Sequence, residues 1–184
     1  MNIGFIGYDW EDLVIYTARR LERLGYRVEL TDRTETGSLL RKWGQEQKKG
    51  LLLGEENGRD IRIFCLKLGT GGEELADCRI LFLVSDEQLY RARLLQGTKR
   101  EGIKRWLLIR NAVGVKYTPA YLGELAGVLE EQVLVIPWAE RDIRQGCYLE
   151  TDSSIPWKRL SSGMRRALEQ MEHCICAEAE EQNG

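Results

Sequence analysis

The sequence predicts an α/β fold in which a mostly parallel β-sheet is covered by helices on both faces, as a three-layer sandwich. Short apolar runs alternate with helical patterns along the chain, and these runs are continuous instead of alternating with polar residues. Continuous apolar strands are typical of parallel sheets, because both faces of such sheets are buried. The predicted strands are Ile3–Ile6, Val28–Leu30, Ile61–Leu66, Ile80–Val84, Leu107–Ile109 and Leu134–Ile136.

A βαβ unit opens the chain. The first strand is followed by a helix over about Trp10–Leu24, whose apolar residues recur at helical spacing, and then by the second strand, which ends at Asp32. Asp9 is a suitable N-cap for this helix, and Gly25 is suited to end it. The two strands are expected to be parallel, with a right-handed crossover between them.

The remaining pattern predicts further helices and one uncertain region. The predicted helices are Gly37–Trp43, Glu87–Gln96, Pro119–Leu129 and Ser161–Ala179. Leu51–Leu53 and Asp60–Leu66 are candidates for a hairpin across the turn Asn57-Gly58. Residues 1–177 are expected to form a single α/β domain, followed by a disordered tail at residues 178–184.

Composition excludes several classes of function. The chain has 184 residues and a formal net charge of -2, so we expect no general attraction to nucleic acid or anionic lipid. No apolar run is long enough to span a membrane. The first residues lack a signal-peptide pattern and the cysteine count is odd, which favours a cytoplasmic protein with reduced thiols. The lone His173, beside Cys174 and Cys176, lacks the spacing of a metal site or a catalytic constellation.

The turn after the first strand is where an open α/β sheet would bind a ligand. It runs from Gly7 to Asp12 and contains one glycine and three carboxylates, those of Asp9, Glu11 and Asp12. A phosphate site needs glycines and free N–H groups at the helix start, whereas these carboxylates would occupy the positive helix end themselves. Self-capping of the helix is therefore favoured over an acidic ligand or metal site, and we expect no bound nucleotide or other cofactor.

Two resemblances bear on function, and the first covers about 30 residues. The opening Ile3-Gly4-Phe5-Ile6-Gly7 resembles NAD(P)-dependent dehydrogenases of the Rossmann type, and Asp32 falls where their ribose-binding acid would be. The glycines that this motif requires at positions 9 and 12 are aspartates here, which would repel a pyrophosphate. A dinucleotide-binding enzyme or small-ligand sensor is therefore the alternative interpretation.

The second resemblance covers nearly the whole chain. Five segments in order resemble the MinD/ParA-type deviant-Walker P-loop ATPases, which position cellular machinery. These segments are Val28–Asp32, Asp60–Gly69, Leu75–Val84, Leu107–Asn111 and Val135–Trp138. The resemblance makes Asp60–Gly69 the counterpart of the Walker B strand and Asn111 the counterpart of the base-reading asparagine.

The catalytic residues of that family are missing from this sequence. Counted from Gly7, the P-loop lysine would fall near Leu13 and the second, signature lysine near Tyr8. The Walker B acid is replaced by Cys65 or Lys67. Catalysis in P-loop enzymes depends on that lysine and on magnesium, so the resemblance implies a pseudo-ATPase. The nearest contextual analogy is with the CpaE/TadZ-like localisation proteins of bacterial Flp pilus loci.

These observations lead to a non-catalytic protein that acts by binding another protein or a second copy of itself. Large aromatic side chains at the carboxyl edge of the sheet would supply the contact, namely Tyr8, Trp10 and Trp138, with core packing as the alternative for the tryptophans. The residues expected at a vestigial nucleotide edge are Gly7, Tyr8, Asp9, Trp10, Asp12, Asp32 and Asn111.

Overall fold

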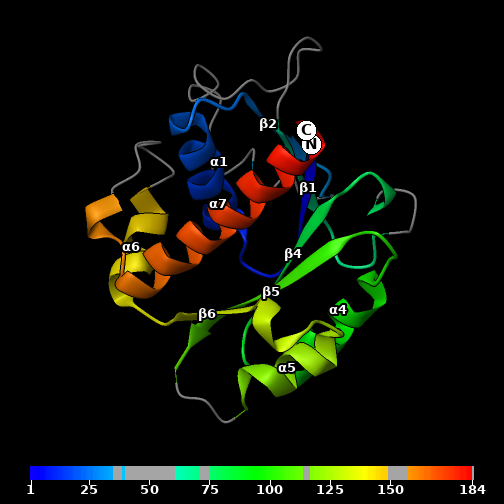
Figure 1. Cartoon of the computed structure of the whole chain (residues 1–184). Helices are drawn as coiled ribbons and strands as arrows, with labels where there is room; N and C mark the ends of the chain where they lie inside the picture. Colours follow the sequence, from blue (N-terminus) through cyan, green and yellow to red (C-terminus); the bar gives the residue numbers. More distant parts are fainter. Residues whose placement is uncertain (35–38, 40–60, 71–74, 114–116, 149–156, 184) are drawn as a thin grey trace.

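The computed structural model describes residues 1–34, 39, 61–70, 75–113, 117–148 and 157–183 (Figure 1). Within these ranges the strands form one six-stranded sheet in the order β2-β3-β1-β4-β5-β6, and every neighbouring pair is parallel. The strands are β1 (Asn2–Gly7), β2 (Val28–Asp32), β3 (Ile61–Leu66), β4 (Ile80–Ser85), β5 (Lys104–Ala112) and β6 (Val133–Pro137). All six predicted strands and their parallel arrangement are confirmed.

Helices cover both faces of the sheet, which confirms the predicted three-layer α/β fold. The longer helices are α1 (Glu11–Arg23), α4 (Leu89–Leu95), α5 (Pro119–Ala126), α6 (Glu140–Tyr148) and α7 (Ser162–Asn183). Helices α1 and α7 pack together on one face, and α4 and α5 pack together on the other (Figure 1). None of the described helices is long and apolar enough to cross a membrane.

Strand side chains divide between two apolar cores because successive residues of a strand point to opposite faces. Phe5 belongs to the core under α1 and α7, where its ring centroid lies 5.0 Å from that of Phe82. Its neighbour Ile6 belongs to the core under α4 and α5, together with Phe64. The continuous apolar strands in the sequence therefore correspond to a sheet that is buried on both faces.

Helix α1 begins differently from the prediction. Trp10 occupies the N-cap position and no side chain caps it, while Asp9 lies before the helix with a left-handed backbone (φ +49°). The prediction that Asp9 caps the helix is therefore wrong, since its backbone turns the chain instead. Gly25 follows the helix with φ +92°, as expected for a residue that ends a helix in the left-handed region.

Two further differences concern β3 and α6. The predicted hairpin is wrong because β3 has a parallel neighbour on each side, β1 and β2, so no antiparallel partner can be added. Residues 51–53, the other half of that hairpin, lie outside the described residues. So do residues 37–43, the predicted short helix, except for Leu39. Helix α6 was not predicted, since its sequence is rich in charge and its buried side chains include Asp142 and Gln145.

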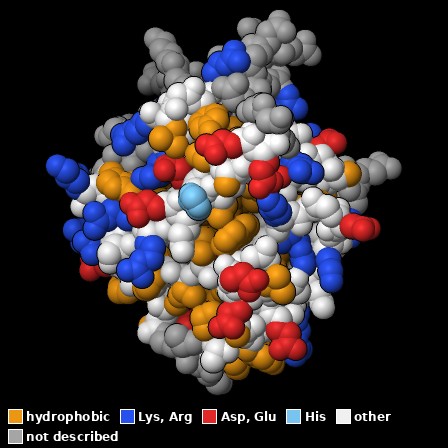
Figure 2. Space-filling model, in the orientation of Figure 1, with side chains coloured by type: hydrophobic (Ala, Val, Ile, Leu, Met, Phe, Trp, Pro, Cys, Tyr) orange, Lys and Arg blue, Asp and Glu red, His pale blue; other side chains and the backbone are white. Residues whose placement is uncertain are grey.

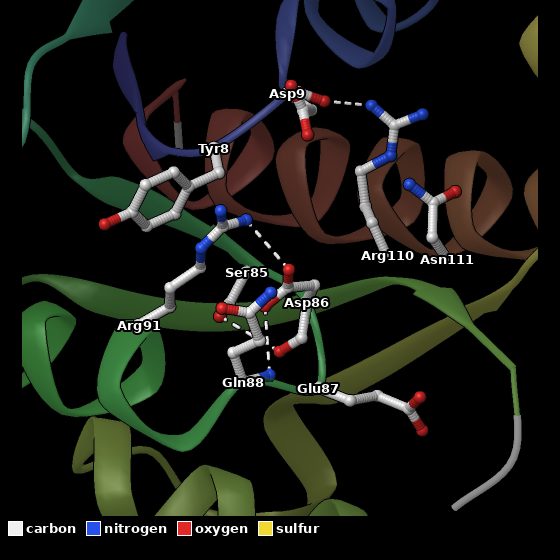
Figure 3. Close-up of a pocket in the computed structure, with 9 residues that line it drawn as sticks. All are labelled: Tyr8, Asp9, Ser85, Asp86, Glu87, Gln88, Arg91, Arg110 and Asn111. Atoms are coloured by element: carbon white, nitrogen blue, oxygen red, sulfur yellow. Dashed lines mark hydrogen bonds and ion pairs between the residues drawn. The ribbon is translucent and has the colours of Figure 1, made fainter.

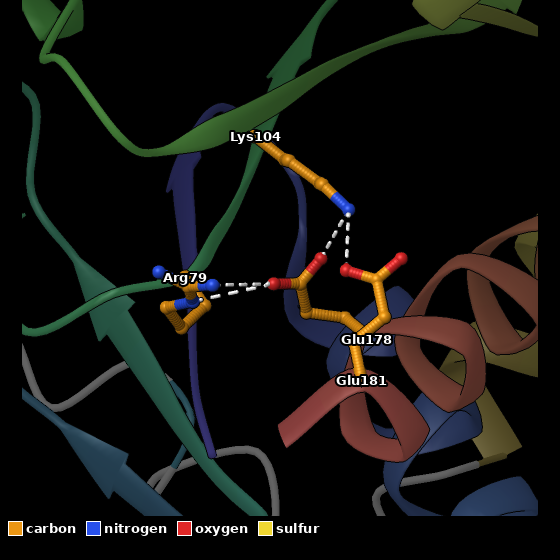
Figure 4. Close-up of polar contacts among 4 residues, drawn as sticks. All are labelled: Arg79, Lys104, Glu178 and Glu181. Atoms are coloured by element: carbon orange, nitrogen blue, oxygen red, sulfur yellow. Dashed lines mark hydrogen bonds and ion pairs between the residues drawn. The ribbon is translucent and has the colours of Figure 1, made fainter. Parts of the chain in front are cut away.

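The end of α7 is fastened to the amino edge of the sheet. The helix continues to Asn183, through most of the segment for which the sequence favours disorder. Glu178 is only 1% exposed and pairs with Arg79 at 3.0 Å and with Lys104 at 2.5 Å (Figure 4). Arg79 directly precedes β4 and Lys104 is the first residue of β5. These contacts hold the helix against two strands, which local sequence alone does not reveal.

We expect Glu178→Gln to lower the free energy of unfolding by about 1–3 kcal/mol at neutral pH, because the amide loses its charged hydrogen bonds. Hydrogen bonding from Lys104, with a smaller contribution from Arg79, lowers the pKa of Glu178. The stabilisation is therefore complete above the ordinary glutamate pKa of about 4.3 and declines as the pH falls through the lower pKa of the folded state. Urea unfolding at pH 7 and pH 3 measures the difference.

The matched control is Glu181→Gln, since Glu181 is mostly exposed and lies 3.4 Å from the same lysine. This change is expected to alter the free energy of unfolding by no more than about 0.5 kcal/mol. A deficit of the Glu178 variant that grows on acidification would contradict the assigned role.

Candidate functional site

The carboxyl ends of β1 and β4 form the point at which the sheet topology reverses. The two strands are neighbours, but α1 follows β1 on one face and α4 follows β4 on the other. Open α/β sheets bind ligands at such points. A pocket of about 230 Å³ lies here (Figure 3). It is lined by Tyr8, Asp9, Ser85, Asp86, Glu87, Gln88, Arg91, Arg110 and Asn111.

The turn after β1 passes very close to the end of β4. Gly7 has φ +130°, and a Cβ atom there would lie 1.9 Å from the carbonyl oxygen of Val84, so only glycine fits. The next residue, Tyr8, donates its backbone N–H to the same carbonyl at 3.0 Å. The turn is therefore fixed by main-chain contact with β4.

Arg110 reaches from β5 to the start of α1. Its guanidinium makes two parallel hydrogen bonds to the carboxylate of Asp12, at 2.7 and 2.9 Å, and donates a further one to the backbone oxygen of Asp9. Arg110 shares a strand face with Leu108, which packs in the core under α1, so strand periodicity directs it toward this helix. Only 8% of Arg110 is exposed. The positive end of α1 is consequently occupied by the protein's own carboxylate, whose charge is neutralised by a buried arginine.

The opposite wall of the pocket has a second neutralised arginine. Arg91, from α4, pairs with Asp86 at 2.8 Å and stacks over the ring of Tyr8, with 4.2 Å from its guanidinium carbon to the ring centroid. Glu87 accepts a hydrogen bond from the backbone N–H of Val113. Both arginines at the pocket therefore already have acidic partners, and an incoming anion would have to displace them.

A deformed stretch of β5 places Asn111 at the pocket. The pairing register between β5 and β6 shifts between Arg110 and Ala112, and Asn111 has φ +55°. Asparagine and aspartate tolerate this left-handed region better than other residues with a side chain, and bulges of this kind redirect side chains. Both such residues at this edge, Asp9 and Asn111, line the pocket.

A tyrosine lies buried one helical turn after Asp12. The hydroxyl of Tyr16 has no hydrogen-bond partner among the described residues. Burial raises the pKa of Tyr16 above its usual value, and the negative charges of Asp12 and Asp142 raise it further. The phenol therefore stays protonated, and the interior beneath the ion pair gains no further negative charge.

Five of the residues predicted at the nucleotide edge lie around the pocket, and the other predicted residues lie elsewhere in the structure. Around the pocket lie Gly7, Tyr8, Asp9, Asp12 and Asn111. Trp10 is 4% exposed and belongs to the core under α1, whereas Trp138 follows β6 and is 50% exposed. Asp32 lies at the end of β2, where its carboxylate accepts hydrogen bonds from the backbone of Thr34 and Leu39 and from the Thr34 hydroxyl.

Two residues that the family resemblance aligns with catalytic positions, Leu13 and Cys65, are buried in the apolar core. Leu13, at the expected place of a P-loop lysine, is fully buried in the core. Cys65 is also buried, and burial raises its pKa well above the usual value, so its thiol stays protonated. Sequence reasoning missed Arg110 and Arg91; the one available signal was an arginine inside the otherwise apolar run of β5.

The six-stranded parallel fold is P-loop NTPase-like, and its arrangement is similar to that of two solved ParA- and MinD-type structures. A ParA family ATPase from Chlorobium tepidum TLS superposes with a TM-score of 0.67 at 12% identity, over 93% of this chain and 96% of that one. A chain of the MinC:MinD cell division protein complex from Aquifex aeolicus gives 0.64 at 11% identity, over 92% and 96%. No family model and no curated protein matches the sequence. At these identities the likeness concerns the fold.

We expect Asp12→Asn to lower the free energy of unfolding by about 3–5 kcal/mol, because it leaves the buried guanidinium of Arg110 without its anionic partner. Combining it with Arg110→Met should recover part of this loss, since both charges are then removed. Urea denaturation of the two single variants and the double variant gives the coupling free energy.

Glu140→Gln provides the control for the Asp12 variant. Glu140 pairs with Arg144 at 2.7 Å on the exposed surface of α6. An exposed pair of this spacing contributes about 0.3–0.5 kcal/mol. Equal losses from the Asp12 and Glu140 variants would contradict the central role of the buried pair.

Proposed function

We propose that this protein is a non-catalytic P-loop NTPase-like domain that acts through contacts with other proteins, in the localisation or assembly of a cytoplasmic bacterial machine. The observation that carries the proposal is the ion pair between Arg110 and Asp12 at the start of α1. It occupies the helix end at which a nucleotide-binding relative would hold phosphate.

Binding of a nucleoside triphosphate at this edge would face three obstacles. Asp12 already uses the positive end of α1, and Asp9 and Glu11 add negative charge to the same turn. The turn contains no lysine to approach a phosphate. Since P-loop catalysis consists mainly of positioning and charge stabilisation, a turn with these residues supplies little toward phosphoryl transfer.

The carboxyl edge also carries exposed apolar side chains suited to protein contact. Trp138 is 50% exposed and Val113 is 80% exposed, and Ile143 on α6 is also exposed. Trp138 donates its backbone N–H to Ala112, the residue before Val113, so these side chains start from adjacent points of the sheet. Tryptophan is enriched among residues that dominate binding energy at interfaces. The MinD-type neighbour was itself solved in a complex with another protein, which supports this kind of role by analogy.

Calorimetric titration with ATP and magnesium is expected to show no binding at millimolar nucleotide, because the turn opposes phosphate. The unfolding temperature should likewise be unchanged by ATP, ADP, GTP or NAD(P)H, whereas a ligand at 100 times its Kd would add about 2.7 kcal/mol of stability. Magnesium-dependent micromolar affinity, or hydrolysis abolished by changing the turn, would overturn the proposal.

Two tryptophan variants separate a contact role from core packing. Trp138→Ala is expected to weaken partner binding or self-association by about 2 kcal/mol or more, with little change in stability, because half of the side chain is exposed. Trp10→Ala is expected to cost about 3–5 kcal/mol of stability, because the ring is buried in the core. Sedimentation equilibrium and affinity capture from the native cell, each combined with urea unfolding, measure both effects. Unchanged association of a well-folded Trp138 variant would exclude that side chain as an anchor.

A further inference from the structure

We infer that the pocket between β1, β4 and β5 receives a single cationic group, the guanidinium or ammonium of an arginine or lysine side chain presented by the partner protein. This inference rests on the proposed function and names the chemistry of the partner. Three features of this edge support a cationic ligand: the size of the pocket, its charge and the exposed apolar side chains that start close to it.

The pocket is smaller than a typical site for a drug-sized ligand and large enough for one side chain. Its volume is about 230 Å³. Sites for drug-sized ligands typically span about 300–1,000 Å³. Arg110 is one of the residues that line this volume, and its bidentate pair with Asp12 fixes its position.

The charge of the pocket favours a cation. Three acidic residues line the pocket, Asp9, Asp86 and Glu87, against two basic ones, Arg91 and Arg110, and Arg110 is paired with Asp12 outside the lining. Each arginine is already paired with one acid, so the charges left over are negative. The carboxylate of Asp9 has no hydrogen-bond or ion-pair partner among the described residues, and Glu87 has no cation beside it there.

Neutral groups at the same site fit a donor-rich cation. In Figure 3 the amide of Asn111 lies beside Arg110, and the described residues offer this amide no hydrogen-bond partner. The side-chain amide of Gln88 lines the same pocket. Guanidinium and ammonium groups carry several N–H donors and no acceptor, so carboxylates and amide oxygens are the partners that they require.

The source of the cation is a protein segment, because the pocket adjoins an exposed apolar surface. Glu87 accepts a hydrogen bond from the backbone of Val113, and Trp138 bonds through its own backbone to Ala112, so the exposed side chains of Val113 and Trp138 start close to the pocket. A free small cation would fill the pocket and leave this apolar surface in water. A peptide with a basic residue between apolar ones would use both, with the charge directing the encounter and the apolar contact adding affinity.

The test is a titration of the full chain followed through its backbone amide NMR signals. The probes are acetyl-arginine amide, its neutral isostere acetyl-citrulline amide, inorganic phosphate, and the capped peptide Leu-Arg-Leu. We expect arginine amide to shift the signals of pocket residues in a saturable way, weakened by added salt, and citrulline amide and phosphate to leave them unchanged. The peptide is expected to bind roughly tenfold more tightly than arginine amide, and Trp138→Ala should remove that gain.

The variants Asp9→Asn and Glu87→Gln, combined in one protein, are expected to weaken arginine amide binding about tenfold. Asparagine keeps the left-handed backbone of residue 9 accessible, so the fold should be retained. Glu140→Gln, which removes an exposed acid outside the pocket, should leave binding unchanged. Equal binding of citrulline amide, displacement of pocket signals by phosphate, or full affinity in the double variant would overturn the inference.

Two further outcomes separate this inference from the proposed function. If ATP and arginine amide both fail to bind while Trp138→Ala still weakens association, the cation pocket is refuted and the protein-binding role stands. If arginine amide binds but the apolar flanks of the peptide add nothing, the protein source is refuted in favour of a free small cation.

Discussion

The ion pair between Asp12 and Arg110 connects helix α1 to strand β5, beside the point between β1 and β4 where the sheet topology reverses. Arg110 is buried and reaches across the end of β4 to the start of α1, where it also holds the backbone of Asp9. A buried charge without a partner is costly, so the position of each group depends on the other. The pair therefore fixes Arg110 as one wall of the pocket, while the contact of the Gly7 turn with Val84 fixes the chain between β1 and α1.

The amino and carboxyl edges of the sheet differ in how their charged side chains are used. At the amino edge, Glu178 forms ion pairs with Arg79 and Lys104. These pairs hold helix α7 against β4 and β5. At the carboxyl edge, the carboxylate of Asp9 and the side chain of Trp138 remain accessible. The carboxyl edge thus has paired charges as well, namely Arg110 with Asp12 and Arg91 with Asp86, but it keeps accessible side chains at the place where parallel sheets bind their ligands.

The likeness to a ParA family ATPase and to the MinC:MinD structure concerns the arrangement of the chain, at 12% and 11% identity. A parallel sheet with this strand order can be kept while its ligand edge is rebuilt, because packing depends on apolar patterning and the site depends on a few polar residues. In this chain the edge has Leu13 buried in the core and a buried arginine at position 110. Function therefore depends on those residues and not on the fold alone.

The sequence by itself determined the six strands, their parallel arrangement and the helices α1, α4, α5 and α7, because burial on both faces leaves a continuous apolar pattern. It also indicated an acidic turn unsuited to phosphate. Only the tertiary structure decided that Asp12 pairs with Arg110, since the two residues are 98 positions apart and meet through the strand order. Likewise, Trp10 and Trp138 each follow shortly after a predicted strand, but Trp10 is buried in the core and Trp138 is exposed. Pairing of distant charges and burial of single rings depend on packing between elements, which local patterns do not encode.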